Sequence, residues 1–416
     1  MSWAAWLATT KTGRLGPRLP LLDGSKATVE LNTGGSSSIV TEGDWLDTIP
    51  MHWWYPWASS IVVAHRTDGL DVDWQPILLG PITDFPACSM TAAAGESGQP
   101  VTLTGGDLRD MLARRIITGT ADWDGASGTW ALQHTSVRYE RMSLGTIADR
   151  IIDLATARQA GSLPIRHRQD LAQTDLSAAV GHARQYDACN LANNGVDKRL
   201  SELSDVIGGP DIMLRPGIDW GDTMTPPAAY ATVIHGVEGQ PQIPQRRTTV
   251  WDATRPAGPV TSISATVDAS QMWTRRWATG AGQDADILMD VRQAEQMLQA
   301  GMPLMEDVTA YSSVTTHATL LAHVDALVAA GQRQTVQWTA TVDLTHPDAS
   351  PGVWHVGDRV RVITPPTRAY AALTEASAQA PWPPRREDRT MTVVKATFDL
   401  CAETATVDLQ EDAADA

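Results

Sequence analysis

The sequence predicts an α+β fold with a β-rich region at each end and a mixed centre. Short strand candidates separated by turn residues fill roughly the first hundred positions, and the same pattern returns after Val260. Between these two regions, apolar residues at helical spacing alternate with extended segments.

The N-terminal region contains five strand candidates, at residues 27–31, 37–46, 61–65, 71–79 and 101–104. Glycines and an Asp-Gly pair supply turn chemistry between them. Short strands in this rhythm predict a small barrel or sandwich. A helix over residues 107–116, with Asp107 as its cap, closes the region.

The centre contains two amphipathic helices. The first covers residues 143–156, with Ser143 as cap and Ile147, Ile151 and Leu154 facing inward. The second ends at Gly208-Gly209, a stop typical of a left-handed helix end, and its apolar stripe consists of Val196, Leu200, Leu203 and Ile207.

Extended segments follow the second central helix and fill most of the C-terminal region. The strand candidates are 211–215, 229–235, 260–267, 272–279, 335–344, 359–363, 391–400 and 405–409. A helix over residues 316–330 buries Leu320, Val324 and Leu327. Residues 364–389 are predicted to form a long exposed loop, because two Pro-Pro pairs exclude ladder hydrogen bonds near both of its ends.

Five segments occur in the order found in one known family. They are PILLGPITDF (76–85), VTLTGGDLRDMLARR (101–115), LSELSDVIGGPDIMLRP (200–216), RRWATGAG (275–282) and WHVGDRVRVI (354–363). The chain resembles the minor tail proteins of actinobacterial tailed phages (siphoviruses), which belong to the central tail-hub family. This family is similar in fold to the baseplate hub of contractile phages. The resemblance extends from about residue 20 to residue 409.

The resemblance implies two β-barrels like the tail-tube domain, separated by a mixed α/β insertion. The expected domains are a first barrel with its closing helix at 1–118, the insertion at 119–250 and a second barrel region at 251–416. Three copies would place six barrels in a ring that continues a sixfold tube.

The resemblance also implies a structural hub in the virion, at the tail tip, assembled in the host cytoplasm. Its expected partners are copies of itself in a homotrimer, the distal tail protein, the tail tube protein, the tape measure protein and tip or fibre proteins. No cofactor, metal or enzymatic activity is expected. Many such proteins carry a lytic or receptor-binding extension, whereas only QEDAADA follows Leu409 here, which favours a bare scaffold.

Composition limits the other classes of function. The net charge of -16 and the pI of about 5.0 argue against specific binding to nucleic acid, although an acidic bore would let DNA pass by like-charge repulsion. No apolar stretch is long enough for a membrane helix, and no signal peptide is evident. The three cysteines, Cys88, Cys189 and Cys401, form neither a disulfide frame nor a metal-ligand pair.

Catalytic motifs are weak. Residues 280–285 formally match the dinucleotide fingerprint G-x-G-x-x-A, but the strand before them is charged, so we interpret them as a turn. The carboxylates Asp68, Asp71 and Asp73 suit hairpin chemistry. Asp122 and Asp124, near Trp123 and Trp130, keep open an alternative function as a carbohydrate-binding or wall-degrading tail protein.

The aromatic run at residues 52–57 (HWWYPW) is the candidate interface. Such density exceeds what one face of a single strand can bury, which favours contact between Trp53, Trp54, Tyr55, Trp57 and another protein surface. On an extended segment, Trp53, Tyr55 and Trp57 would share one face and Trp54 would take the other. The alternative is a local cluster folded inside the first barrel.

Overall fold

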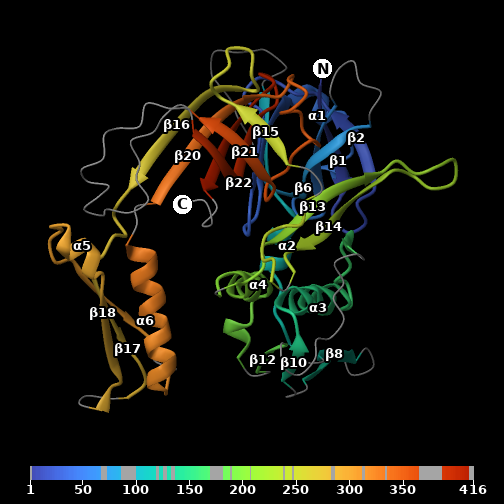
Figure 1. Cartoon of the computed structure of the whole chain (residues 1–416). Helices are drawn as coiled ribbons and strands as arrows, with labels where there is room; N and C mark the ends of the chain where they lie inside the picture. Colours follow the sequence, from blue (N-terminus) through green and yellow to red (C-terminus); the bar gives the residue numbers. More distant parts are fainter. Residues whose placement is uncertain are drawn as a thin grey trace, which may run out of the picture.

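The computed structural model describes most of the chain. The described residues are 2–66, 73–85, 100–118, 121–124, 129–132, 136–168, 181–187, 190–206, 208–237, 239–245, 248–282, 286–311, 314–332, 335–364 and 387–411. They form one large β body with two α/β lobes extending from it (Figure 1).

A 13-stranded sheet forms the β body. Its order is β16 (Val260–Asp268), β20 (Thr335–Asp343), β23 (Thr404–Glu411), β22 (Glu387–Asp399), β3 (Lys26–Glu30), β4 (Ser36–Glu42), β7 (Pro100–Gly106), β6 (Gln75–Asp84), β5 (Ser59–His65), β1 (Trp3–Thr9) and β2 (Leu15–Leu19). A branch of β21 (Arg359–Thr364) and β15 (Thr249–Asp252) joins it at β22.

Strand β22 connects the two β-rich ends of the chain. Its first half pairs with β21, from Glu387 opposite Thr364 onward, and its second half pairs with β3, where Lys395 lies opposite Glu30. Because β23 pairs along the other edge of β22, β21 and β3 lie end to end on the same edge. The N-terminal and C-terminal regions therefore share one sheet.

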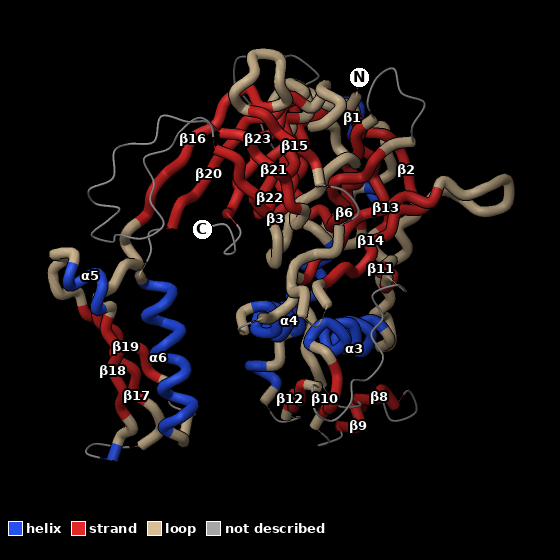
Figure 2. Tube along the Cα trace, viewed as in Figure 1, coloured by secondary structure: helices blue, strands red, loops and turns tan. Residues whose placement is uncertain are grey.

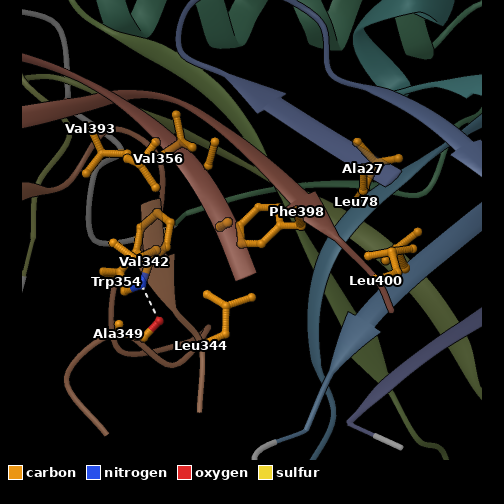
Figure 3. Packing of buried hydrophobic residues seen from close by; sticks show 14 of the residues in the cluster. Ala27, Leu78, Val342, Leu344, Ala349, Trp354, Val356, Val393, Phe398 and Leu400 are labelled. Atoms are coloured by element: carbon orange, nitrogen blue, oxygen red, sulfur yellow. Dashed lines mark hydrogen bonds between the residues drawn. The ribbon is translucent and has the colours of Figure 1, made fainter. Parts of the chain in front are cut away.

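The principal core also spans both ends. Phe398 on β22 lies 5.9 Å from Trp354 and 5.7 Å from Trp3, measured between ring centroids. Figure 3 shows Phe398 between residues from the C-terminal region, such as Val342, and the N-terminal residues Ala27 and Leu78. The two β-rich ends thus form one hydrophobic unit.

The first lobe follows β7. It contains α2 (Leu108–Ala113), β10 (Val137–Met142), α3 (Leu144–Thr156), β11 (Ile165–His167), β12 (His182–Tyr186), α4 (Val196–Ser204), β13 (Ile212–Asp219) and β14 (Ala228–His235). It also carries the hairpin β8 (Ala121–Asp124) and β9 (Thr129–Leu132), and the short helix η2 (Leu191–Asn193). Three strands form a small sheet in the order β11-β14-β13.

The local sequence explains helix α3 well. The Ser143 hydroxyl accepts a hydrogen bond from the Thr146 amide at 3.1 Å, which satisfies one of the free donors at the helix start. Ile147 and Ile151 are fully buried, as their spacing predicts. Leu154 is only partly buried against this core. Val196, Leu200 and Leu203 of α4 pack into the same core, whereas α4 ends at Ser204 and residue 207 of its predicted stripe lies outside the described residues.

The second lobe is inserted between β16 and β20. It contains β17 (Arg275–Thr279), β18 (Met289–Gln293), α5 (Glu295–Gln299), β19 (Glu306–Ala310) and α6 (His317–Gly331). The strand order is β18-β17-β19, and α6 covers one face of this sheet (Figure 2).

The described structure is mostly β with few helices, which is compatible with the predicted α+β class. Within the described segments, the strand pairings of the β body form one branched sheet without a closed ring, so the two barrels stay a prediction. The domain boundaries at 118 and 250 likewise stay predictions. Among the described helices, none is long and apolar enough to cross a membrane.

Several predicted boundaries were wrong. Residues 43–46, expected in a strand, begin the helix α1 (Gly43–Asp47), because β4 ends at Glu42. The strand expected at 272–279 begins only at Arg275. Residues 387–389, expected in the long loop, belong to β22, and residues 365–386 of that loop lie outside the described residues.

Candidate assembly interface and buried ionic sites

The aromatic run does not form the predicted extended segment. Residues Met51–Trp53 form the short helix η1, and Trp53 and Trp54 donate their backbone N–H groups to Pro50 and Met51 at 2.9 and 3.0 Å. Because a helical turn replaces the extended backbone, the predicted alternation of faces is wrong.

Two of the indoles pack onto the main core. The ring of Trp53 covers Gly16, where an added Cβ would lie 2.3 Å from the ring, so only glycine allows this approach. Trp54 donates its indole N–H to the Ile49 carbonyl at 3.1 Å and meets Phe85 edge-on at 5.1 Å. Both rings are half-buried, which supports part of the alternative of a local cluster.

Trp57 and Tyr55 occupy different environments. Trp57 has a φ of 66°, a left-handed conformation that bulky residues rarely adopt. Its backbone N–H donates to Ile82 at 2.9 Å, and the Arg114 guanidinium lies 3.8 Å from the centre of its ring. Tyr55 is 52% exposed. The run therefore leaves Tyr55 as an exposed aromatic ring beside three half-buried indoles.

A partly buried ionic network lies in the first lobe. His167 approaches Asp149 with Nδ1 and Asp153 with Nε2, both at 2.8 Å. His235, whose side chain is 1% exposed, lies 3.3 Å from the other oxygen of Asp149 through Nε2, and its Nδ1 lies 2.6 Å from the Gly236 carbonyl. With an acceptor at both ring nitrogens, each imidazole suits the doubly protonated form.

The electrostatics of the network agree with this geometry. The hydrogen bond with Asp149 is the main reason that the pKa of His167 is raised, although burial opposes it. Burial by itself would lower the pKa of His235, but hydrogen bonds with Asp149 and Gly236 raise it above its usual value. Burial likewise opposes ionisation of Asp149, yet its two histidine partners lower its pKa. The network is an ion cluster that ties α3 to β11 and β14.

A second perturbed carboxyl caps helix α2. Asp107 accepts hydrogen bonds from the Arg109 amide at 2.7 Å and from the Gly35 amide at 2.8 Å, so its predicted role as the cap is confirmed. Burial raises the pKa of Asp107 to about 7, and the two backbone hydrogen bonds only partly oppose this rise. Arg109, two residues later, is itself buried and pairs with Asp197.

A cavity of about 510 Å3 lies between the first lobe and the C-terminal region. Arg215 of β13 reaches across to Asp358, with 3.4 Å between Nη2 and Oδ1, and the His355 backbone N–H donates to the same carboxylate at 3.0 Å. Burial lowers the pKa of both Arg215 and His355. The ion pair between Arg215 and Asp358 in this cavity therefore connects the first lobe to the C-terminal region.

The described residues give little support to the catalytic sites considered from the sequence. Residues 280–282 follow β17, which pairs antiparallel with β18, and this hairpin agrees with the predicted turn rather than a dinucleotide site. Trp123 lies opposite Trp130 in the β8–β9 hairpin, but the side chains there, like residues 68 and 71, lie outside the described residues. Within the described part of the chain, no group of three or more His, Cys, Asp or Glu residues could hold a metal.

The fold matches solved structures of tail proteins. The tail protein from Neisseria meningitidis MC58 is similar with a TM-score of 0.55 and 13% identity, over 99% of this chain and 97% of that one. The 43 kDa tail protein of prophage MuSo2 from Shewanella oneidensis is similar with a TM-score of 0.53 and 12% identity, over 99% of this chain and 98% of that one. At these identities the similarity shows a shared fold.

No protein-family model matches the sequence, and no curated protein matches it. The structural neighbours share the fold of this chain and are themselves named tail proteins, which is compatible with the coarser part of the predicted resemblance. They do not test the narrower assignment to actinobacterial siphoviruses.

Proposed function

We propose that this chain is a structural component of a phage tail, a hub at the tail tip without enzymatic activity. The observation that supports this most strongly is the fold similarity to two tail proteins over nearly the whole chain. The joining of both β-rich ends into one sheet also fits a rigid scaffold.

As such a hub, the chain forms a homotrimer that closes the tail tube and connects the distal tail protein above to tip or fibre proteins below. The tape measure protein and the tube protein are its other partners, and a siphovirus of actinobacteria is the proposed source. The excess of carboxylates, with a net charge of -16, supports an acidic bore that repels passing DNA.

Imaging of the particle with this chain located tests the proposal. Three copies at the tail tip are the expected result, and any other copy number contradicts the trimer. A bore lined mainly by arginine contradicts the acidic lumen.

The aromatic run supplies a second test, at the level of assembly. Tyr55→Ala removes an exposed ring with little effect on the fold, whereas Trp53→Ala would open a gap over Gly16. An aromatic anchor can contribute about 2 kcal/mol to an interface, so Tyr55→Ala should reduce tail completion. Met224→Ala, which changes another exposed apolar residue, serves as the control. Equal yields of complete tails from both variants would remove Tyr55 from the interface.

The alternative function, carbohydrate binding or wall degradation, depends on Asp122 and Asp124. The pairing of Trp123 with Trp130 in one hairpin is the observation in its favour. The test is whether the purified chain releases sugar from host wall material. Release that is lost in Asp122→Asn or Asp124→Asn would support this alternative over the structural function.

A further inference from the structure

The cavity between the first lobe and the C-terminal region has the size of a ligand site. Its volume of about 510 Å3 lies within the range of roughly 300–1,000 Å3 that small-molecule sites occupy. Arg215 and Gly217 of β13 pair directly with Thr232 and Tyr230 of β14, so these four residues lie on one face of the small sheet and form the floor. A wall comes from residues 352–358, before β21. Two regions of the chain thus build this cavity.

The floor of the cavity is held in shape by an aromatic ring. An added Cβ on Gly217 would lie 2.6 Å from Cζ of Tyr230, so the ring of Tyr230 lies directly over this glycine. The Arg166 guanidinium lies 3.7 Å from the centre of the same ring and adds a cation–π contact. The floor is therefore defined by packed side chains.

Arg215 has more hydrogen-bond donors than the described residues satisfy. Its one hydrogen bond to them joins Nη2 to Oδ1 of Asp358 at 3.4 Å, a long distance for a charged pair, and its Nε–H group is buried without a partner among them. Asp358 also accepts from the His355 backbone N–H. Because an unmade hydrogen bond of a buried charged group is costly, the guanidinium favours a further acceptor in the cavity.

Positive charge exceeds negative charge among the described residues that line the cavity. Arg168 and Arg215 are cationic, and Asp358 is the acidic member of this lining. Burial lowers the pKa of His355, so this imidazole adds no charge near neutral pH. Burial is also the main cause of the lowered pKa of Arg215, and the charge of Arg168 is a smaller cause. Two guanidinium groups that repel each other in a partly buried site favour an anion between them.

We propose that this cavity binds a small organic anion through a carboxylate or phosphate group. Arg168 and Arg215 hold the anionic group, since a planar guanidinium donates paired hydrogen bonds to either kind of oxyanion. The hydroxyl group of Tyr230 is a further donor on the floor. Apolar lining residues such as Ile234 and Val353 contact the carbon part of the ligand.

A bound anion would connect the two regions that build the cavity. Arg168 and Arg215 belong to the first lobe, whereas residues 352–358 belong to the C-terminal region. A ligand that contacts both therefore stabilises their junction in addition to the ion pair between Arg215 and Asp358. The site is separate from the proposed assembly function, because a chain that binds no anion can still be a tail component.

Isothermal titration calorimetry on the full-length chain tests the proposal. The probes are phenyl phosphate and benzoate, which carry the same ring on a phosphate and on a carboxylate, and phenol is the uncharged control. At least one of the two anions should bind saturably at one site per chain, and the tighter of them identifies the preferred head group. Phenol should bind much more weakly. Failure of both anions to bind, or equal binding of phenol, overturns the proposal.

Two variants test whether the cavity holds the anion. Arg168→Gln should weaken binding by about tenfold or more, because it removes a charged donor. Arg138→Gln removes the same charge from an exposed side chain of the same lobe and should bind as the wild type does. Arg215→Lys keeps the charge beside Asp358 without the planar guanidinium, so it should also weaken binding. Equal affinities of the Arg168 and Arg138 variants would indicate an adventitious ion only and would overturn the site.

Hydrogen exchange locates the bound probe independently of affinity. Backbone amides in β13 and in residues 352–358 should exchange more slowly at saturating probe, whereas amides of α6 should be unchanged. A probe that protects neither segment binds elsewhere, and the proposal then fails.

Discussion

The two α/β lobes differ in how they are joined to the β body. The first lobe shares a hydrophobic cluster with it, in which Ala8, Val62 and Leu79 of the body contact Leu108, Ala229 and Ala231. The second lobe has its own small core, whose buried members all lie between Ala278 and Val328. One lobe is thus part of the body, and the other is a nearly independent attachment.

Polar contacts follow the same division. In the first lobe Asn32 of the body donates to Asp211 at 2.8 Å and accepts from the Ile212 amide at 2.7 Å, while Arg109 is buried beside Asp197. In the second lobe, Arg292 pairs with Asp325 at 2.9 Å through side chains that are both exposed. Buried polar contacts cost more to break than exposed ones, so the lobes should respond differently to the same perturbation.

Excision of each lobe tests the comparison most severely. Asp268 and Thr335 are direct partners at the end of the β16–β20 ladder, so residues 269–334 can be replaced by an Asn-Gly hairpin turn. We expect this variant to keep the main thermal unfolding transition, because no buried member of the second core comes from the body. Excision of residues 119–211 should abolish the transition. A shorter chain without 269–334 that fails to unfold cooperatively would contradict the independence of the second lobe.

A matched pair of core substitutions has the next largest effect. Ile151 of α3 and Leu320 of α6 are both fully buried, and truncation to Ala costs about 2–5 kcal/mol at such sites. Ile151→Ala should lower the main melting temperature. Leu320→Ala should instead speed hydrogen exchange in residues 272–332 and leave the main transition in place. Equal shifts of the main transition would show that the two lobes unfold together.

The cap of α2 lies where the first lobe meets the body, and it should give a smaller, pH-dependent effect. Because the folded pKa of Asp107 is about 7 against an ordinary 3.8, the folded state holds a proton in this range and loses stability as the pH rises through it. Asn keeps the acceptor for the Arg109 amide without the charge, but its NH2 group cannot accept from the Gly35 amide. Relative to the wild type, Asp107→Asn should therefore be more favourable near pH 8 than near pH 4 by about 1–2 kcal/mol. Denaturant unfolding at the two pH values measures this, and equal effects at both would refute it.

The smallest expected effect comes from the histidine network. The pKa values of His167 and His235 are raised above 6.5, so their stabilisation is complete below that pH and is lost as the pH rises through the folded values. The pKa of Asp149 is lowered below 3.8, so its contribution is lost only in stronger acid. His167→Gln should flatten the decline of stability above neutral pH. Hydrogen exchange of the backbone amides in α3 should differ between this variant and the wild type, and hydrogen exchange in α6 should be the same in both.

Local chemistry explains which parts could be predicted from sequence. Helix α3 was predicted closely because its cap and its apolar spacing lie within one segment. The strand β2 was missed because Gly16 and Pro17 weaken its pattern, and its place is set by pairing with β1. The connection of β3 to β22 depends on residues at opposite ends of the chain, which no local pattern specifies.

At the candidate sites too, local sequence patterns did not predict contacts between distant segments. The aromatic run was found from its density, but its backbone was predicted wrongly because Pro50 and the following turn favour a short helix over an extended strand. The Asp149 network was not predicted, because its members come from α3, β11 and β14 and meet only after folding.

The pairing of β3 with β22 has a consequence for synthesis. Thr28 and Thr397 meet across this pair at 3.1 Å although they are 369 residues apart in sequence. At ordinary translation rates the ribosome needs roughly 20–75 s to cover that distance, and during this time β3 has no partner on that edge. A truncated chain that ends before β22 cannot complete the sheet, and its open edge makes it a substrate for chaperones and proteases. The sheet can therefore be completed only after almost the whole chain has been synthesised.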